Sequence, residues 1–101
     1  MSDGAKFDEL IHPATRLSVV AILAAADWAE FSFVRDQLNL SDSALSKQLA
    51  TLEEAGYIVI ERPLTERRRR VRARLTPLGR ERYAGHVAAL REIIAGAPQT
   101  T

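Results

Sequence analysis

The stretch from Ser41 to Tyr57, SDSALSKQLATLEEAGY, constrains the fold most, because it contains the start, the end and the buried face of one helix. The hydroxyl of Ser41 can accept a hydrogen bond from a free backbone N–H at a helix start. Gly56 is the residue type most often found just beyond a helix end. Between them, apolar residues recur at helical spacing, namely Leu45, Leu49, Leu52 and Ala55. The stretch therefore predicts a capped amphipathic helix over residues 42–55.

The opposite side of this helix carries small or hydrogen-bonding side chains and a single cation. They are Ser43, Ser46, Lys47, Ala50 and Thr51. A helix that only faces water usually carries a mixture of long charged side chains instead. Small side chains let another surface approach closely, and hydroxyl and ammonium groups bind phosphates and base edges. We therefore hypothesise that this face enters the major groove of DNA.

Charge is distributed unevenly along the 101 residues, although the net charge is only +1. Residues 1–56 contain four Lys or Arg and nine Asp or Glu, whereas residues 57–101 contain ten and four. Seven of the arginines lie between Arg62 and Arg74. This cluster lies within a strand–turn–strand pattern and not in a tail. It therefore indicates a polyanionic partner, the alternative being a solvated charge run.

The whole pattern predicts one domain, mainly α-helical with a small β-hairpin. A flexible N-terminus, residues 1–6, precedes a short helical turn and a widely buried helix at about 14–26. A very short strand at 29–31 and a second helix capped by Ser32 then lead into the helix at 42–55. Two short helices joined by a tight turn form a helix-turn-helix.

A hairpin is predicted over residues 57–76, with a turn at 63–69. Its second strand alternates apolar residues (Val71, Ala73, Leu75) with arginines (Arg70, Arg72, Arg74), so that one face is basic. Arg74 has an alternative, structural role, because it could pair with Glu61 on the neighbouring strand.

Thr76 and Pro77 begin a last helix over residues 77–95, and residues 96–101 are expected to be disordered. This helix carries apolar residues at the spacing of a coiled coil, namely Tyr83, Val87, Leu90 and Ile94. The stripe either packs on the chain's own helix at 14–26 or on a second copy, and we expect it to serve both. Phe7, Leu10 and Ile11 are expected to join the same dimer interface.

Several function classes are disfavoured by what the sequence lacks. The absence of cysteine excludes disulfides and thiolate metal sites, and no signal peptide or membrane span is apparent. There is no nucleophile motif or Gly-rich phosphate loop. His12 and His86 are far apart in sequence, and His86 is expected to be exposed or at an interface rather than a ligand. We expect a cytoplasmic, non-enzymatic protein without metal or cofactor.

Three segments together resemble the small winged helix-turn-helix transcriptional regulators of the MarR and ArsR type. They are FDELIHPATRLSVVAIL, LSKQLATLEEAGYI and RLTPLGRERY, and the resemblance runs from Phe7 to about Ile94. It implies a homodimeric DNA-binding regulator, with the 42–55 helix in the major groove and the hairpin as a wing on the flanking backbone or minor groove. We expect this regulator to be a repressor. A small-molecule effector at the dimer cleft is implied by the resemblance alone. The Cys motif and paired ligands of the metal-sensing branch are absent.

The expected DNA contacts of the recognition helix are Ser41, Ser43, Ala44, Ser46, Lys47, Gln48 and Thr51. Among them, Gln48 offers an amide that could pair with adenine. The expected DNA contacts of the wing are Arg67, Arg68, Arg69, Arg70 and Arg72. Two alternatives remain open, a winged helix that docks on another protein and a hairpin that binds structured RNA.

Overall fold

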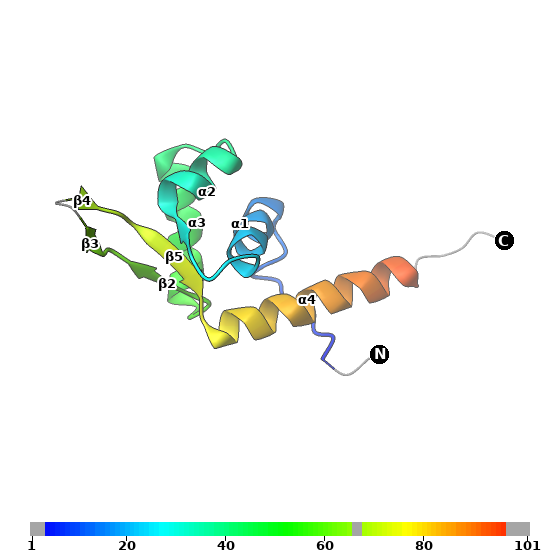
Figure 1. The fold of residues 1–101 in the computed structure, drawn as a ribbon. Coiled ribbons are helices and arrows are strands. Elements are labelled where there is room, and N and C mark those ends of the chain that lie inside the picture. Colours follow the sequence, from blue (N-terminus) through cyan, green and yellow to red (C-terminus); the bar gives the residue numbers. More distant parts are fainter. Residues whose placement is uncertain (1–3, 66–67, 97–101) are drawn as a thin grey trace.

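The computed structural model describes residues 4–65 and 68–96, which form four helices and two small antiparallel sheets (Figure 1). In chain order the elements are α1 (Ala14–Ala24), β1 (Ala29–Glu30), α2 (Phe31–Gln37), α3 (Asp42–Glu54), β2 (Ile58–Glu61), β3 (Leu64–Thr65), β4 (Arg68–Arg69), β5 (Arg72–Leu75) and α4 (Pro77–Ala95). The predicted class, mainly α-helical with a small hairpin, is confirmed.

The larger sheet has the order β1-β5-β2, so β5 is its central strand. Ala73 of β5 lies opposite Ala29 on one side and Ile60 on the other. Beyond this sheet the hairpin continues as the two-stranded ribbon β3–β4, in which Leu64 pairs with Arg69. The region predicted as a turn at 63–69 is thus shorter than expected, because backbone pairing extends the hairpin toward its tip.

The core lies between α1, α3 and the inner face of the larger sheet. Its completely or almost completely buried side chains include Ile11, Val19, Val20, Leu23, Val34, Leu45, Leu52 and Ile58. The stripe predicted for the 42–55 helix is therefore its inward face. Removal of this apolar surface from water is the main stabilising contribution to the fold.

Helix α2 begins one residue before the predicted cap, so the prediction that Ser32 caps it is wrong. Its N-cap is Glu30, without a side-chain hydrogen bond. The backbone N–H of Phe31 instead donates to the carbonyl oxygen of Val71 at 2.8 Å. Because the sheet satisfies this free N–H, a capping hydroxyl is not needed there. Asn39 then adopts a left-handed backbone conformation, with φ of 53°, in the turn to α3.

The junction between α3, β2 and α4 is held by hydroxyl groups and one close backbone approach. Ser41 Oγ accepts from the N–H of Ala44 at 3.1 Å, which confirms the predicted cap of α3. Thr76 Oγ1 caps α4 in the same way and also donates to the carbonyl oxygen of Gly56 at 2.7 Å. Gly79 lies directly on Tyr57, where an added Cβ would overlap the carbonyl oxygen of Tyr57.

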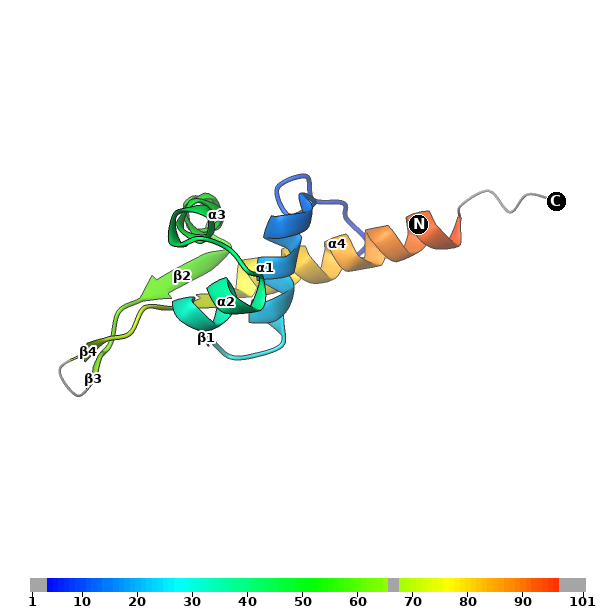
Figure 2. The same cartoon turned by 90° about the horizontal axis from the view of Figure 1, so that it is seen from above.

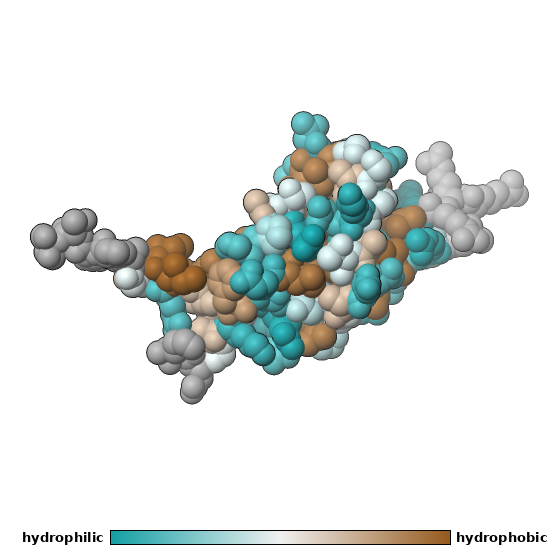
Figure 3. All heavy atoms as spheres, turned by 180° about the vertical axis from the view of Figure 1, so that it is seen from behind, coloured by the Kyte–Doolittle hydropathy of each residue, from teal (hydrophilic) through white to brown (hydrophobic). Residues whose placement is uncertain are grey.

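Helix α4 and the hairpin project at opposite ends of the molecule (Figures 1 and 2). One side of α4 packs on the rest of the chain through Gly79, Gly85, His86 and Ala89, whereas Ile93 and Ile94 near its end are 57% and 73% exposed. Figure 3 shows apolar atoms gathered at this free end.

Helix α1 is shorter than predicted and ends at Ala24. Within residues 4–65 and 68–96, no helix has the length and apolarity needed to cross a membrane.

Candidate nucleic-acid interface

The outward face of α3 carries five of the predicted recognition residues around one shallow hollow. Ser43, Ser46 and Lys47 are exposed, Ala44 and Gln48 are half-buried, and all five line the hollow. The large exposed hydrophobic side chains of the described residues all lie on other segments. The face thus carries small and hydrogen-bonding side chains and is open to an incoming surface.

Two further predicted residues of this helix use their hydroxyls locally. Ser41 Oγ accepts the capping hydrogen bond and lies 3.3 Å from Ser43 Oγ. Thr51 Oγ1 donates to the carbonyl oxygen of Lys47 at 3.2 Å. These bonds orient Ser41 and Thr51 at the edges of the face, and their contact with DNA stays a prediction.

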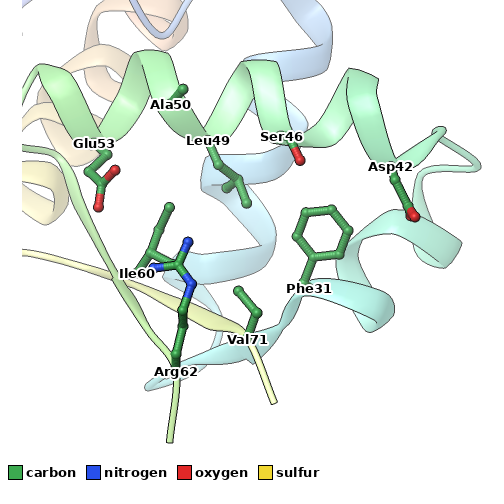
Figure 4. A pocket seen from close by; sticks show the side chains of 9 residues that line it. All are labelled: Phe31, Asp42, Ser46, Leu49, Ala50, Glu53, Ile60, Arg62 and Val71. Carbon is green, nitrogen blue, oxygen red and sulfur yellow. The ribbon is translucent and has the colours of Figure 1, made fainter. Parts of the chain in front are cut away.

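A groove of about 430 Å³ lies between α3 and the base of the hairpin (Figure 4). Its floor is apolar, formed by side chains that include Phe31, Leu49, Ile60 and Val71. Ser46 and the charged residues Asp42, Glu53 and Arg62 lie around it. Ser46 therefore borders both the hollow and the groove, so that the groove continues the outward face of α3 toward the hairpin.

Two residues that are not among the predicted DNA contacts, Arg62 and Glu53, also line the groove. Both are exposed and approach the groove from opposite sides, Glu53 from α3 and Arg62 from just beyond β2 (Figure 4). Arg62 belongs to the arginine cluster recognised in the sequence. Its place beside α3 depends on the pairing of β2 with β5, which the local pattern does not specify.

The acidic start of α3 is neutralised by α2. Arg35 donates to Asp36 and to Asp42, both at 2.9 Å. These two carboxylates raise the pKa of Arg35, with hydrogen bonds as the main cause. Because Asp42 already has a cationic partner, its charge opposes an incoming polyanion less strongly than a free carboxylate does.

The predicted wing arginines divide into several groups. Arg67 lies outside the described residues. Arg68 and Arg69 form β4, with only their backbone described. Arg70 is exposed and pairs with Glu30 at 3.1 Å. Since Arg70 is about half exposed, this surface pair can exchange for a phosphate at small cost.

Arg72 and Arg74 lie at the base of the wing and both bind Glu61. Their Nε atoms donate to its two carboxylate oxygens at 3.0 and 3.2 Å. These two hydrogen bonds hold the pKa of Glu61 below its ordinary value, and the bond from Arg74 is the larger cause. Arg72 also stacks over Trp28, with 4.5 Å from its guanidinium carbon to the ring centroid. The structural pairing considered for Arg74 is present, and Arg72, predicted as a DNA contact, shares it.

The predicted dimer residues differ widely in exposure. Ile11 is completely buried in the core of one chain, so its assignment to a dimer interface is corrected. Tyr83 is half-buried and packs against the same core. Phe7 is 37% exposed and Ile94 is 73% exposed. The remaining three, Leu10, Val87 and Leu90, are half-buried.

The prediction that His86 is exposed or at an interface is wrong, and the two histidines, far apart in sequence, are neighbours in the fold. His86 is completely buried, and its Nδ1 accepts from the N–H of Asp8 at 2.9 Å. Its ring centroid lies 4.7 Å from that of Phe7 and 5.4 Å from that of His12. Burial, together with the nearby His12, lowers the pKa of His86. The N-terminal segment folds back on α4, which brings these residues together.

Asp8 connects this cluster to the end of α3. Its Oδ2 accepts from the hydroxyl of Tyr57 at 2.6 Å, and its Oδ1 accepts from the N–H groups of Leu10 and Ile11. Burial, and then the bond to Asp8, raises the pKa of Tyr57. Within the described part of the chain, no three His, Cys, Asp or Glu side chains are grouped so that they could hold a metal ion.

A protein-family model described as "Winged helix DNA-binding domain" matches residues 15–94. The chain is 22% identical over 85 residues to an uncharacterised protein, MJ0432, of Methanocaldococcus jannaschii, covering 84% of this chain and 92% of that protein.

The structure resembles that of a transcriptional regulator homologue from Pyrococcus horikoshii, with a TM-score of 0.83, 22% identity and 88% of each chain covered. A MarR-family regulator from Silicibacter pomeroyi has a TM-score of 0.61 and 26% identity, covering 89% of this chain and 62% of that one. A third similar structure is the homodimeric winged helix-turn-helix domain of Mb0332 from Mycobacterium bovis, a possible ArsR-family regulator. It has a TM-score of 0.67 and 14% identity, covering 92% of this chain and 82% of that one.

Proposed function

The chain belongs to the winged helix DNA-binding domain family, and on that premise we propose that it is a homodimeric, sequence-specific repressor that binds double-stranded DNA. In this proposal α3 is the recognition helix and lies in the major groove. The hairpin is a wing on the flanking phosphates or in the adjacent minor groove. Two copies bind two half-sites of one operator.

The observation that carries the proposal is the outward face of α3. Ser43, Ser46 and Lys47 are exposed together on a helix whose opposite side is held in the core by Leu45 and Leu52. Such a helix is rigidly placed and offers hydrogen-bonding groups at its surface. In helix-turn-helix proteins, the N-terminal and outward residues of this helix contact base edges.

The hairpin supports the same partner through its charge. Arg62 and Arg70 are exposed on the two arms of the hairpin, Arg62 beside the groove, and the arginines at 67–69 lie between them in the sequence. Guanidinium groups bind phosphate oxygens in a bidentate manner and also enter narrow minor grooves. The hairpin therefore suits a polyanion that already contacts α3.

A second copy of the chain is the proposed partner of α4. Ile93 and Ile94 give its free end an apolar surface that one chain leaves exposed. The structurally similar Mb0332 domain is homodimeric. A symmetric dimer would present its two recognition helices about one DNA turn apart, roughly 34–36 Å.

The decisive test is selection of bound sites from a random double-stranded DNA library with the full chain. The proposal expects a motif with two inverted half-sites whose centres are about one helical turn apart. Failure to enrich any motif would overturn sequence-specific recognition. Stronger binding of RNA than of DNA duplexes of equal length would favour the RNA-binding alternative. A single half-site would contradict the dimer.

A further inference from the structure

Arg16 of α1 reaches the underside of the outward face of α3. Its Nε donates to Oε1 of Gln48 at 3.0 Å, and its Nη1 donates to the carbonyl oxygen of Leu10 at 2.8 Å. Arg16 and Gln48 are both half-buried, and 32 positions separate them in the sequence. One guanidinium thus fixes the side chain of Gln48 from behind.

The direction of this bond determines how the amide of Gln48 is oriented. A guanidinium has only donors, so the atom of Gln48 that faces Arg16 is the amide oxygen. The amide nitrogen has no hydrogen-bond partner among the described residues. Gln48 lines the same hollow as Ser43 and Lys47, and Arg16 engages its oxygen, which leaves the N–H groups as the end available to a partner in the hollow.

This orientation changes the base that Gln48 suits. Pairing with adenine in the major groove needs both ends of the amide, since the oxygen must accept from N6 and the nitrogen must donate to N7. In guanine, O6 and N7 are both acceptors, which suits a side chain that presents N–H groups. The pairing of Gln48 with adenine that the sequence suggests is therefore disfavoured by the contact with Arg16.

We propose that Arg16 is a positioning residue that turns the amide N–H groups of Gln48 toward the DNA, so that each half-site carries guanine at the position Gln48 contacts. This inference rests on the proposed function, because it assigns a base preference to the same recognition helix. Arg16 itself does not touch the DNA. It acts by holding the oxygen of Gln48 toward α1, so that the N–H groups are the end turned to the DNA.

The test repeats the site selection with Q48A, R16M, R16K and the double variant R16M/Q48A. Q48A identifies the base position, because preference is lost only there. At that position the parent protein selects guanine. In R16M the oxygen of Gln48 is released, and we expect adenine to rise about tenfold relative to guanine, the scale of one bidentate side chain–base pair. R16K, which restores a donor, should restore guanine.

Two controls separate positioning from a general structural role. In R16M/Q48A the loss of Arg16 should cause no further change of preference, because the side chain it positions is absent. R80M removes another arginine that donates to backbone carbonyl oxygens, those of Ala24 and Ala26, and should leave the motif unchanged.

A further variant keeps the test decisive if R16M does not fold. Q48E retains an acceptor for Arg16 but has no N–H, so its preference should change from guanine to cytosine, whose N4 is a donor. Selection of adenine by the parent, or an unchanged motif in folded R16M or in Q48E, would overturn the inference. If the parent enriches no motif at all, the proposed function itself fails, which is a distinguishable result.

Discussion

Helices α3 and α4 begin in the same way but expose different chemistry. Each starts at a hydroxyl residue that accepts a backbone N–H three positions later, Ser41 from Ala44 and Thr76 from Gly79. The exposed side of α3 is small and polar, whereas the free end of α4 exposes isoleucines. The comparison shows that local sequence signals place a helix, while its exposed side chains determine which partner it suits.

The largest effect should come from charging the free end of α4. In I93E/I94E, two carboxylates replace the apolar surface proposed to bind the second copy. We expect a monomer by light scattering, and binding to a duplex with both half-sites weakened about a hundredfold through lost bivalency.

The matched control is F33E, which places a charge on the exposed Phe33 of α2 and should leave the oligomeric state unchanged. A dimeric I93E/I94E protein would show that the proposed dimer uses another surface.

A smaller effect is expected from the wing. R68A/R69A should weaken binding to all sequences alike, because phosphates carry no sequence information. At about 0.9 per lost phosphate contact, the slope of log K against log salt should flatten by about 1.8, which corresponds to roughly thirtyfold weaker binding near 0.15 M salt. Fluorescence anisotropy titrations at several salt concentrations measure both values.

Two other substitutions sharpen the contrast between the wing and the recognition helix. K47A should change the preferred sequence in addition to weakening binding. R74A should leave the slope nearly unchanged, because Glu61 already engages Arg74. If R74A flattened the slope of log K against log salt as much as R68A/R69A, Arg74 at the base of the wing would contact phosphates as the outer arginines do, which contradicts this prediction.

The two caps should differ in their contribution to the free energy of unfolding. S41A removes one capping bond and should cost about 1 kcal/mol. T76A removes the equivalent cap and also the hydrogen bond to Gly56, so we expect about 1.5 kcal/mol. Urea denaturation measures both, and T76S should retain most of the stability. Equal losses in S41A and T76A would show that the bond to Gly56 contributes little.

The smallest effect is a dependence of stability on pH through His86. The pKa of His86 in the folded protein lies below its ordinary value of 6.5. As pH falls below 6.5, the unfolded chain therefore binds the proton first and the free energy of unfolding decreases. For a single proton the decrease is at most about 1.4 kcal/mol per pH unit.

Urea titrations between pH 7.5 and 5.5 should show this decrease in the parent protein. H86Q should flatten it, whereas H12Q, which alters the exposed His12, should retain most of it. An identical pH dependence in the parent protein and H86Q would assign the effect to another group.

The sequence predicts those features that depend on neighbours along the chain. The caps at Ser41 and Thr76, the inward stripe of α3 and the length of α4 all follow from local spacing. Ser32 failed as a cap because Val71, forty residues away in sequence, satisfies the backbone N–H of Phe31.

The functional surface could be predicted less completely for the same reason. The alternation at 70–75 correctly places Arg72 and Arg74 on one face, but their engagement by Glu61 depends on strand register. The burial of His86 requires the N-terminal segment to fold back on α4, which no periodicity indicates. No local pattern marks Arg16, because its partner Gln48 lies on another helix.

In the proposed dimer, Gly79 has a consequence for how the two half-sites can be arranged. At this residue the start of α4 lies directly on the backbone of Tyr57, immediately after the end of α3. The angle between α3 and α4 is therefore set by a contact between two backbone segments, and backbone segments cannot repack as side chains do. In a dimer built on α4, substitutions at its free end would change how tightly the copies associate, while this joint would fix the orientation of each recognition helix relative to its own α4.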